Sequence, residues 1–106
     1  MKINPLNGNQ AWAIAASRVI QDGSFRSISG ITYLAKVCED YIAYNGGNRN
    51  NGEEEIISKA DFVAGYNAIR DLEEINTNTI KTLLPGSLYR KRTPFIGLLF
   101  SAEIIK

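Results

Sequence analysis

The sequence predicts an all-α fold, a small bundle of about four to five helices with a buried C-terminal helix. Two observations support this prediction. Apolar residues between positions 30 and 44 recur at steps of three and four, which is the period of a helix with one buried face. Residues 93–106 hold the densest apolar run, and a helix that is apolar on nearly every side must be surrounded by other elements.

The length and the residue types exclude most enzyme chemistry. At 106 residues the chain is expected to form one domain, 1–106, whose core needs neither a metal nor a disulfide. The chain has no histidine, which removes the serine and cysteine triads, the usual zinc sites and the commonest general base near neutral pH. We therefore expect no enzyme, no cofactor and no metal site.

The first helix is expected over residues 10–21. Asn9 precedes it as an N-cap, and Gly23 follows it where a left-handed C-cap would stand. Trp12 is interpreted as a core anchor rather than a ligand-stacking ring. The segment 24–29 is expected to be a linker. The rest of the apolar face of the helix is Ala15, Ala16 and Val19, with Ile20 at its margin.

A second helix is expected over residues 30–44. Cys38 falls on its apolar face, so we interpret this residue as a small buried hydrophobe and not as a nucleophile. Residues 45–52 are all turn formers or strongly polar, and they are predicted to form a mobile loop that divides the chain. The apolar stripe of this helix consists of Ile31, Leu34, Ala35, Cys38, Tyr41 and Ile42.

A third helix is expected from Ser58 to about residue 74. Ser58 is the N-cap, and Asp61 stands where its partner in a capping box would be. The inner face of this helix is formed by Phe62, Val63, Tyr66, Ile69 and Leu72.

Acidic residues flank the third helix at both ends. Glu53, Glu54 and Glu55 are expected to favour its N-terminus or to form a solvated face. The alternative for these three is an acidic contact patch or a weak divalent-cation site. Glu73 and Glu74 oppose the helix dipole at the C-terminal end, which indicates a partner or basic residues nearby in the fold.

Two more helical segments are expected before the C-terminus. Residues 75–79 form a turn, and residues 80–84 form one or two helical turns that end at Pro85. The C-terminal helix begins with Thr93 as N-cap and Pro94 at the first helical position, where its missing N–H costs nothing. The alternative for this region is a short β-hairpin within residues 87–105.

One basic cluster, Tyr89-Arg90-Lys91-Arg92, precedes the C-terminal helix. The net charge is only +1, but residues 53–75 hold seven Asp/Glu and two Lys/Arg, whereas residues 76–106 hold one Asp/Glu and five Lys/Arg. These segments either pair within the fold or form two opposite surfaces. Three cations beside an aromatic ring are suited to a carboxylate-rich protein surface or to a phosphate backbone.

These features predict a non-enzymatic protein that binds a protein partner, of the inhibitor, immunity or adaptor type. The many isoleucines and asparagines hint at an AT-rich genome such as that of a phage or another mobile element. The candidate partner-binding residues are Tyr89, Arg90, Lys91, Arg92, Glu53, Glu54, Glu55, Glu73 and Glu74.

Two alternative functions stay open at this level. The segment between Thr77 and Arg92 has a helix-turn-helix-like pattern, which favours a small DNA-binding regulator. In the second alternative, the chain is a structural subunit that buries apolar surface in a homo-oligomer.

The longest apolar run of the chain is well below the ~20 residues that span a bilayer, and no targeting signal is present. A cytoplasmic protein without membrane contact is therefore expected.

Overall fold

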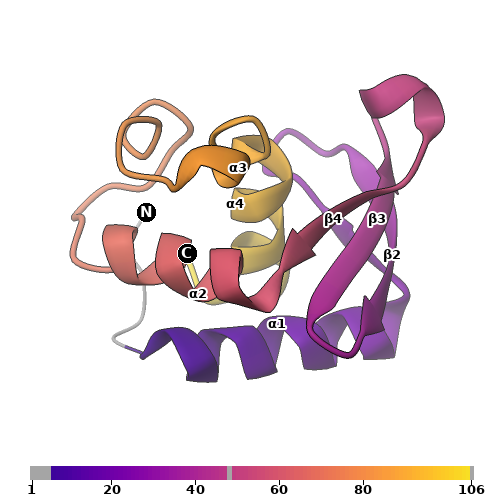
Figure 1. Ribbon diagram of the computed structural model, residues 1–106, viewed down its shortest axis with the longest axis horizontal. Coiled ribbons are helices and arrows are strands. Elements are labelled where there is room, and N and C mark those ends of the chain that lie inside the picture. Colours follow the sequence, from indigo (N-terminus) through magenta and orange to yellow (C-terminus); the bar gives the residue numbers. More distant parts are fainter. Residues whose placement is uncertain (1–5, 48, 106) are drawn as a thin grey trace.

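The computed structural model describes residues 6–47 and 49–105, which form an α+β fold with helices packed on one face of an antiparallel sheet (Figure 1). The prediction of an all-α helical bundle is therefore wrong. No helix among these residues is long and apolar enough to cross a membrane. In chain order the elements are α1 (Gly8–Asp22), β1 (Ser24–Arg26), β2 (Thr32–Cys38), β3 (Tyr41–Gly46), the 3₁₀ helix η1 (Arg49–Gly52), β4 (Glu55–Ser58), α2 (Lys59–Ile69), α3 (Gly86–Tyr89) and α4 (Arg92–Ser101).

The sheet is a meander in which each strand is antiparallel to the next, in the order β1-β2-β3-β4. Phe25 stacks on Tyr33 with ring centroids 4.8 Å apart, and Tyr44 meets both rings edge-on. Because alternate residues of a strand point to opposite faces, these rings define the inner face of the sheet. Ile42 and Ile57 complete that face, and all five side chains belong to the core that the helices share.

The helix predicted over residues 30–44 is instead the hairpin of β2 and β3. Residues 39–40 form its tight turn, between Cys38 and its partner Tyr41. This segment is rich in β-branched and aromatic residues, which lose rotamer freedom in a helix and pack well on a pleated sheet. Burial alternates from Thr32 to Val37, which places Leu34 and Lys36 on the exposed face of the strand. Cys38, predicted to be buried, is half-buried on the face opposite the core.

Helix α1 confirms the first predicted helix, with its start shifted. Asn7, not Asn9, is the N-cap: its side chain accepts from the backbone N–H of Gln10 at 2.8 Å, and the Gln10 side chain accepts from Asn7 N–H at 3.0 Å. Gly23 adopts the predicted left-handed C-cap, with φ 66°. The expected linker 24–29 contains a strand, because its first residues pair with β2.

The predicted loop 45–52 is correct in part. β3 continues to Gly46, and η1 covers residues 49–52 of a connection that projects from the body of the molecule (Figure 1). Asn48 lies outside the described residues.

Helix α2 begins at the predicted cap and ends early. Ser58 Oγ accepts from the backbone N–H of Asp61 at 3.1 Å. The helix stops at Ile69, about five residues before the predicted end, and Asn76 then organises a turn farther along the chain. The Asn76 carboxamide accepts from two successive N–H groups, those of Asn78 and Thr79, at 2.9 Å each. Such side-chain bonds offer the backbone an alternative to a helix.

The C-terminal region confirms a buried helix and contradicts the details around it. Residues 80–84 form turns and not helical turns, and the alternative hairpin within residues 87–105 is absent from the described part. α4 begins at Arg92, so Thr93 is not its cap, and Lys91 stands at the N-cap position without a side-chain hydrogen bond. Lys106, at the end of the predicted helical stretch, lies outside the described residues.

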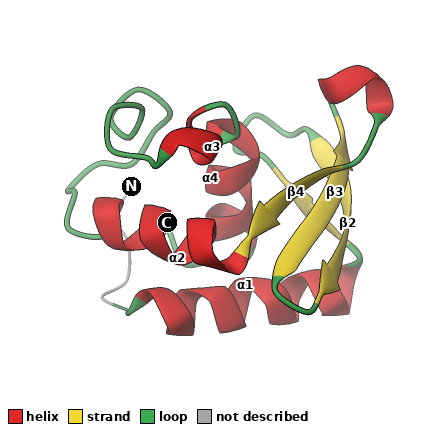
Figure 2. Ribbon diagram, viewed as in Figure 1, coloured by secondary structure: helices red, strands yellow, loops and turns green. Residues whose placement is uncertain are grey.

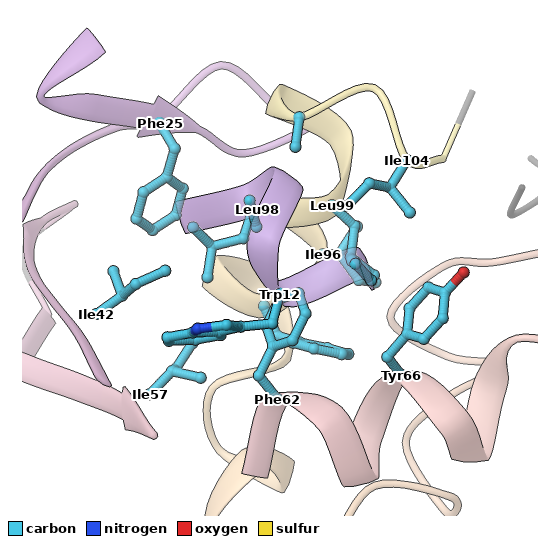
Figure 3. Packing of buried hydrophobic residues seen from close by; sticks show 14 of the residues in the cluster. Trp12, Phe25, Ile42, Ile57, Phe62, Tyr66, Ile96, Leu98, Leu99 and Ile104 are labelled. Atoms are coloured by element: carbon cyan, nitrogen blue, oxygen red, sulfur yellow. The ribbon is translucent and has the colours of Figure 1, made fainter. Parts of the chain in front are cut away.

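The helices and the sheet share one hydrophobic core. Trp12 of α1 meets Phe62 of α2 edge-on at 5.4 Å, and Phe62 meets Phe95 of α4 at the same separation. Figure 3 shows Trp12 and Phe62 beside Ile42 and Ile57 of the sheet. The interpretation of Trp12 as a core anchor is therefore confirmed.

Candidate protein-binding surface

The face of the sheet that points away from the helices is the largest unusual feature of the surface. Figure 2 shows the helices gathered on one side of the strands. Alternation and register place nine residues of β2, β3 and β4 on the opposite side, which we name the outer face. They are Thr32, Leu34, Lys36, Cys38, Tyr41, Ala43, Asn45, Ile56 and Ser58.

The centre of the outer face is apolar. Lys36, Ala43 and Ile56 stand opposite one another on three adjacent strands. Ala43 is only 1% exposed, because its larger neighbours cover it, whereas Leu34 is 65% and Ile56 44% exposed. A shallow groove of about 330 Å³ runs beside Leu34 and over Ala43. The solvated face of an antiparallel sheet is normally polar, so this composition indicates a contact surface.

One edge of the outer face is acidic. Lys36 forms an ion pair with Glu54 at 3.6 Å, but both side chains are more than half exposed, so the pair stabilises the fold by only about 0–1 kcal/mol. Tyr41 lies opposite Cys38 at the end of the hairpin. A hydrogen bond to the Cys38 sulfur raises the pKa of the Tyr41 hydroxyl, and the carboxylates of Glu54 and Asp40 act in the same direction.

The predicted basic cluster lies against β4, beside the outer face. Lys91 Nζ donates to the carbonyl oxygen of Ile56 at 2.6 Å. Arg92 donates to the carbonyl oxygen of Tyr89 at 2.7 Å, and its guanidinium lies 4.5 Å from the centre of the Tyr89 ring. Lys91 and Arg92 therefore hold the fold together, but their partners are neutral carbonyls and an aromatic ring, so both keep their positive charge. Tyr89 is exposed beside them.

The predicted acidic residues are divided between two places. Glu53 and Glu54 are exposed just before β4, and Glu55 is the first residue of that strand. Glu54 reaches Lys36 and so joins the rim of the outer face. Glu73 and Glu74 are exposed in the bend after α2. The structure thus brings Glu54 and the basic cluster to one sheet and leaves Glu73 and Glu74 outside it.

The apolar residues of the outer face were not among the predicted site residues. Leu34 belonged to a stripe that the helical interpretation buried, and Ile56 belonged to no predicted element. The sequence holds no clear signal for this exposure, because Leu34 stands between two other apolar residues, Tyr33 and Ala35.

Within the described ranges, no group of three or more Cys, Asp and Glu side chains is placed to hold a metal ion. The contact between the Ser87 hydroxyl and the Asp61 carboxylate lies at the N-terminus of α2, where the charge of Asp61 also interacts favourably with the helix dipole.

No family model matches the sequence, and neither a curated protein nor a solved structure matches the chain.

Proposed function

We propose that this protein is a non-enzymatic binding module that docks its outer face on a protein partner, in the manner of an inhibitor, immunity or adaptor protein. The observation that carries the proposal is the exposure of Leu34 and Ile56 on a sheet whose other face is fully used by the core. Burying such side chains contributes roughly 25 cal/mol per Å² of apolar area. Exposed apolar patches on a protein surface mark sites of interaction with other proteins.

The charged residues beside the outer face indicate which charges the partner surface should carry. Lys91 lies at the β4 edge with its charge unneutralised, and Lys36 lies across the face from it on β2. A partner surface with an apolar centre and carboxylates at its rim would meet both lysines. Because rim charges act mainly on the rate of association and on specificity, the apolar centre supplies most of the affinity.

The DNA-binding alternative has less support in the geometry. The segment between Thr77 and Arg92 consists of turns and the four-residue helix α3, which is too short to lie along a major groove as a recognition helix. A homo-oligomer that uses the same outer face is the remaining alternative, and the experiment below separates it.

The test is capture from a lysate of the native cell with three tagged proteins: wild type, Leu34→Asp/Ile56→Asp, and Ile20→Asp. Ile20 is a matched control, because it is 72% exposed on α1 and lies outside the outer face. Capture is performed with and without nuclease at two salt concentrations.

The expected result is a discrete protein that survives nuclease and higher salt, is retained by Ile20→Asp and is lost from the double variant. Recovery of nucleic acid that disappears at higher salt would overturn the proposal in favour of DNA binding. A concentration-dependent mass that the double variant abolishes, with no captured protein, would show that the outer face binds a second copy of the chain.

A further inference from the structure

A second surface, at the β1 edge of the sheet, forms a groove of about 610 Å³ where the ends of α1 and α4 meet β1. Its lining combines apolar and charged side chains with the backbone of an edge strand. The residues used below are Arg18, Asp22, Ser24, Arg26, Phe100 and Glu103.

Alternate residues of β1 direct their backbone N–H and C=O groups toward the groove. Gly23 accepts from the N–H of Ala35 at 3.0 Å, and Ser27 donates to Ile31 at 2.9 Å, so the odd-numbered residues face β2. Residues 24 and 26 therefore present their N–H and C=O groups to the open edge. Ser101 Oγ forms hydrogen bonds with both the backbone N–H and the backbone C=O of Arg26. No described residue pairs with the N–H or the C=O of Ser24, so one donor and one acceptor of a strand edge stay open in the groove.

The charges along the groove follow the direction of the strand. Asp22 lies two residues before Ser24, and Arg26 lies two residues after it. Within the described residues neither side chain has a hydrogen-bond or ion-pair partner, whereas Arg18 is already paired with Glu103 at 3.5 Å. Phe100 is 39% exposed beside them and offers an apolar contact.

We propose that this groove binds an extended peptide segment that adds one rung to the β1 edge at Ser24. The segment runs antiparallel to β1, as do all neighbouring strands of the sheet. It carries a carboxylate toward Arg26, a cation toward Asp22 and an apolar side chain between them, near Phe100. Main-chain hydrogen bonds supply affinity in such strand addition, and the side chains supply selectivity. This site lies at the β1 edge, where Ser24 stands opposite Leu34 of the outer face, and it goes beyond the proposed function.

The test uses the purified full-length protein and the blocked peptide Ac-Glu-Thr-Val-Thr-Lys-NH₂, with the reversed order Ac-Lys-Thr-Val-Thr-Glu-NH₂ as a control. Binding is measured by titration with amide chemical shifts as the readout. The diagnostic variant is Ser24→Pro, which removes only the outward N–H. Proline is tolerated where an edge-strand N–H faces solvent and directly after a helix C-cap. Ser24→Ala keeps the N–H and is the matched control.

The expected result is that the first peptide binds at least about tenfold more tightly than the reversed one, with shifts centred on β1 and Phe100. Ser24→Pro weakens binding about tenfold, Ser24→Ala leaves it unchanged, and Arg26→Gln weakens it severalfold. Folding of each variant is checked from its own amide spectrum. Failure of wild type to bind either peptide at millimolar concentration would overturn the proposal, as would equal affinity of Ser24→Pro and Ser24→Ala. Neither outcome bears on the outer face, which the capture experiment tests.

Discussion

The hydroxyl of Ser101 holds both backbone groups of Arg26, 75 residues away in the sequence: it accepts from Arg26 N–H at 2.8 Å and donates to the Arg26 carbonyl at 3.1 Å. One side chain of α4 therefore takes the place of a neighbouring strand at the β1 edge. An edge covered in this way is protected from unwanted strand pairing.

Ser101→Ala is expected to lower the free energy of unfolding by about 1–2 kcal/mol, because two hydrogen bonds are lost while water can reach part of the edge. Urea denaturation followed by tryptophan fluorescence measures the change. Ser17→Ala is the control, since Ser17 is exposed on α1 without a side-chain hydrogen bond in the described part, and it should change stability by less than about 0.5 kcal/mol. Equal effects of the two substitutions would contradict the role assigned to Ser101.

Gly97→Ala is expected to destabilise the protein although alanine favours helices. A Cβ at position 97 would lie 3.0 Å from the Arg26 carbonyl oxygen and 3.2 Å from Ser27 Cα. Both are backbone atoms, and Ser101 holds the first in place. Overpacking costs about 1–3 kcal/mol, which outweighs the gain of about 1 kcal/mol in helix propensity. Gly86→Ala, with no atom within 4 Å of its new Cβ, should be neutral or stabilising in the same denaturation experiment. A stabilised Gly97→Ala variant would show that α4 can move away from β1.

Asn7→Ala is expected to cost about 1 kcal/mol of unfolding free energy, because it removes the capping box that starts α1. Asn9→Ala, at an exposed position inside the helix, should be neutral or slightly stabilising. Thermal unfolding followed by circular dichroism gives both values. If the two variants melted together, the predicted cap at Asn9 would regain support against the observed cap at Asn7.

The sequence predicted the helices whose ends carry local chemical signals. Gly23 and Ser58 marked real boundaries, because a left-handed glycine and a capping hydroxyl act within one turn of their own position. The sheet was not predicted because the spacing of its apolar residues also fits a helix, and strand pairing depends on residues that are far apart in the sequence. Leu34 and Ala35 lie three and four residues after Ile31 and also alternate across a strand, and only pairing with β3 decides between the two structures.

The candidate site was predicted at its charged rim and not at its apolar centre. The basic cluster was found because its charges stand together in the sequence. In the structure Lys91 of this cluster contacts Ile56, which is 35 residues away in the sequence. Their proximity depends on the position of β4 in the sheet, which was not predicted. The open backbone groups of Ser24 have no sequence signal at all, since any residue carries an N–H and a C=O.

Tyr66 is expected to make the protein unusually sensitive to alkaline pH. Burial raises the pKa of its hydroxyl above 10.0, although the Leu6 backbone and the charge of Arg70 oppose the shift. The unfolded chain then loses this proton at a lower pH than the folded protein, so the stabilising contribution is complete below about pH 10 and is lost as the pH rises through the folded-state value. Tyr66→Phe should therefore lose less stability than wild type between pH 9 and pH 11 in urea denaturation. Tyr89→Phe, at an exposed ring, is the matched control and should follow the wild-type curve. A Tyr66→Phe curve parallel to wild type would show that folding does not raise the pKa of this hydroxyl.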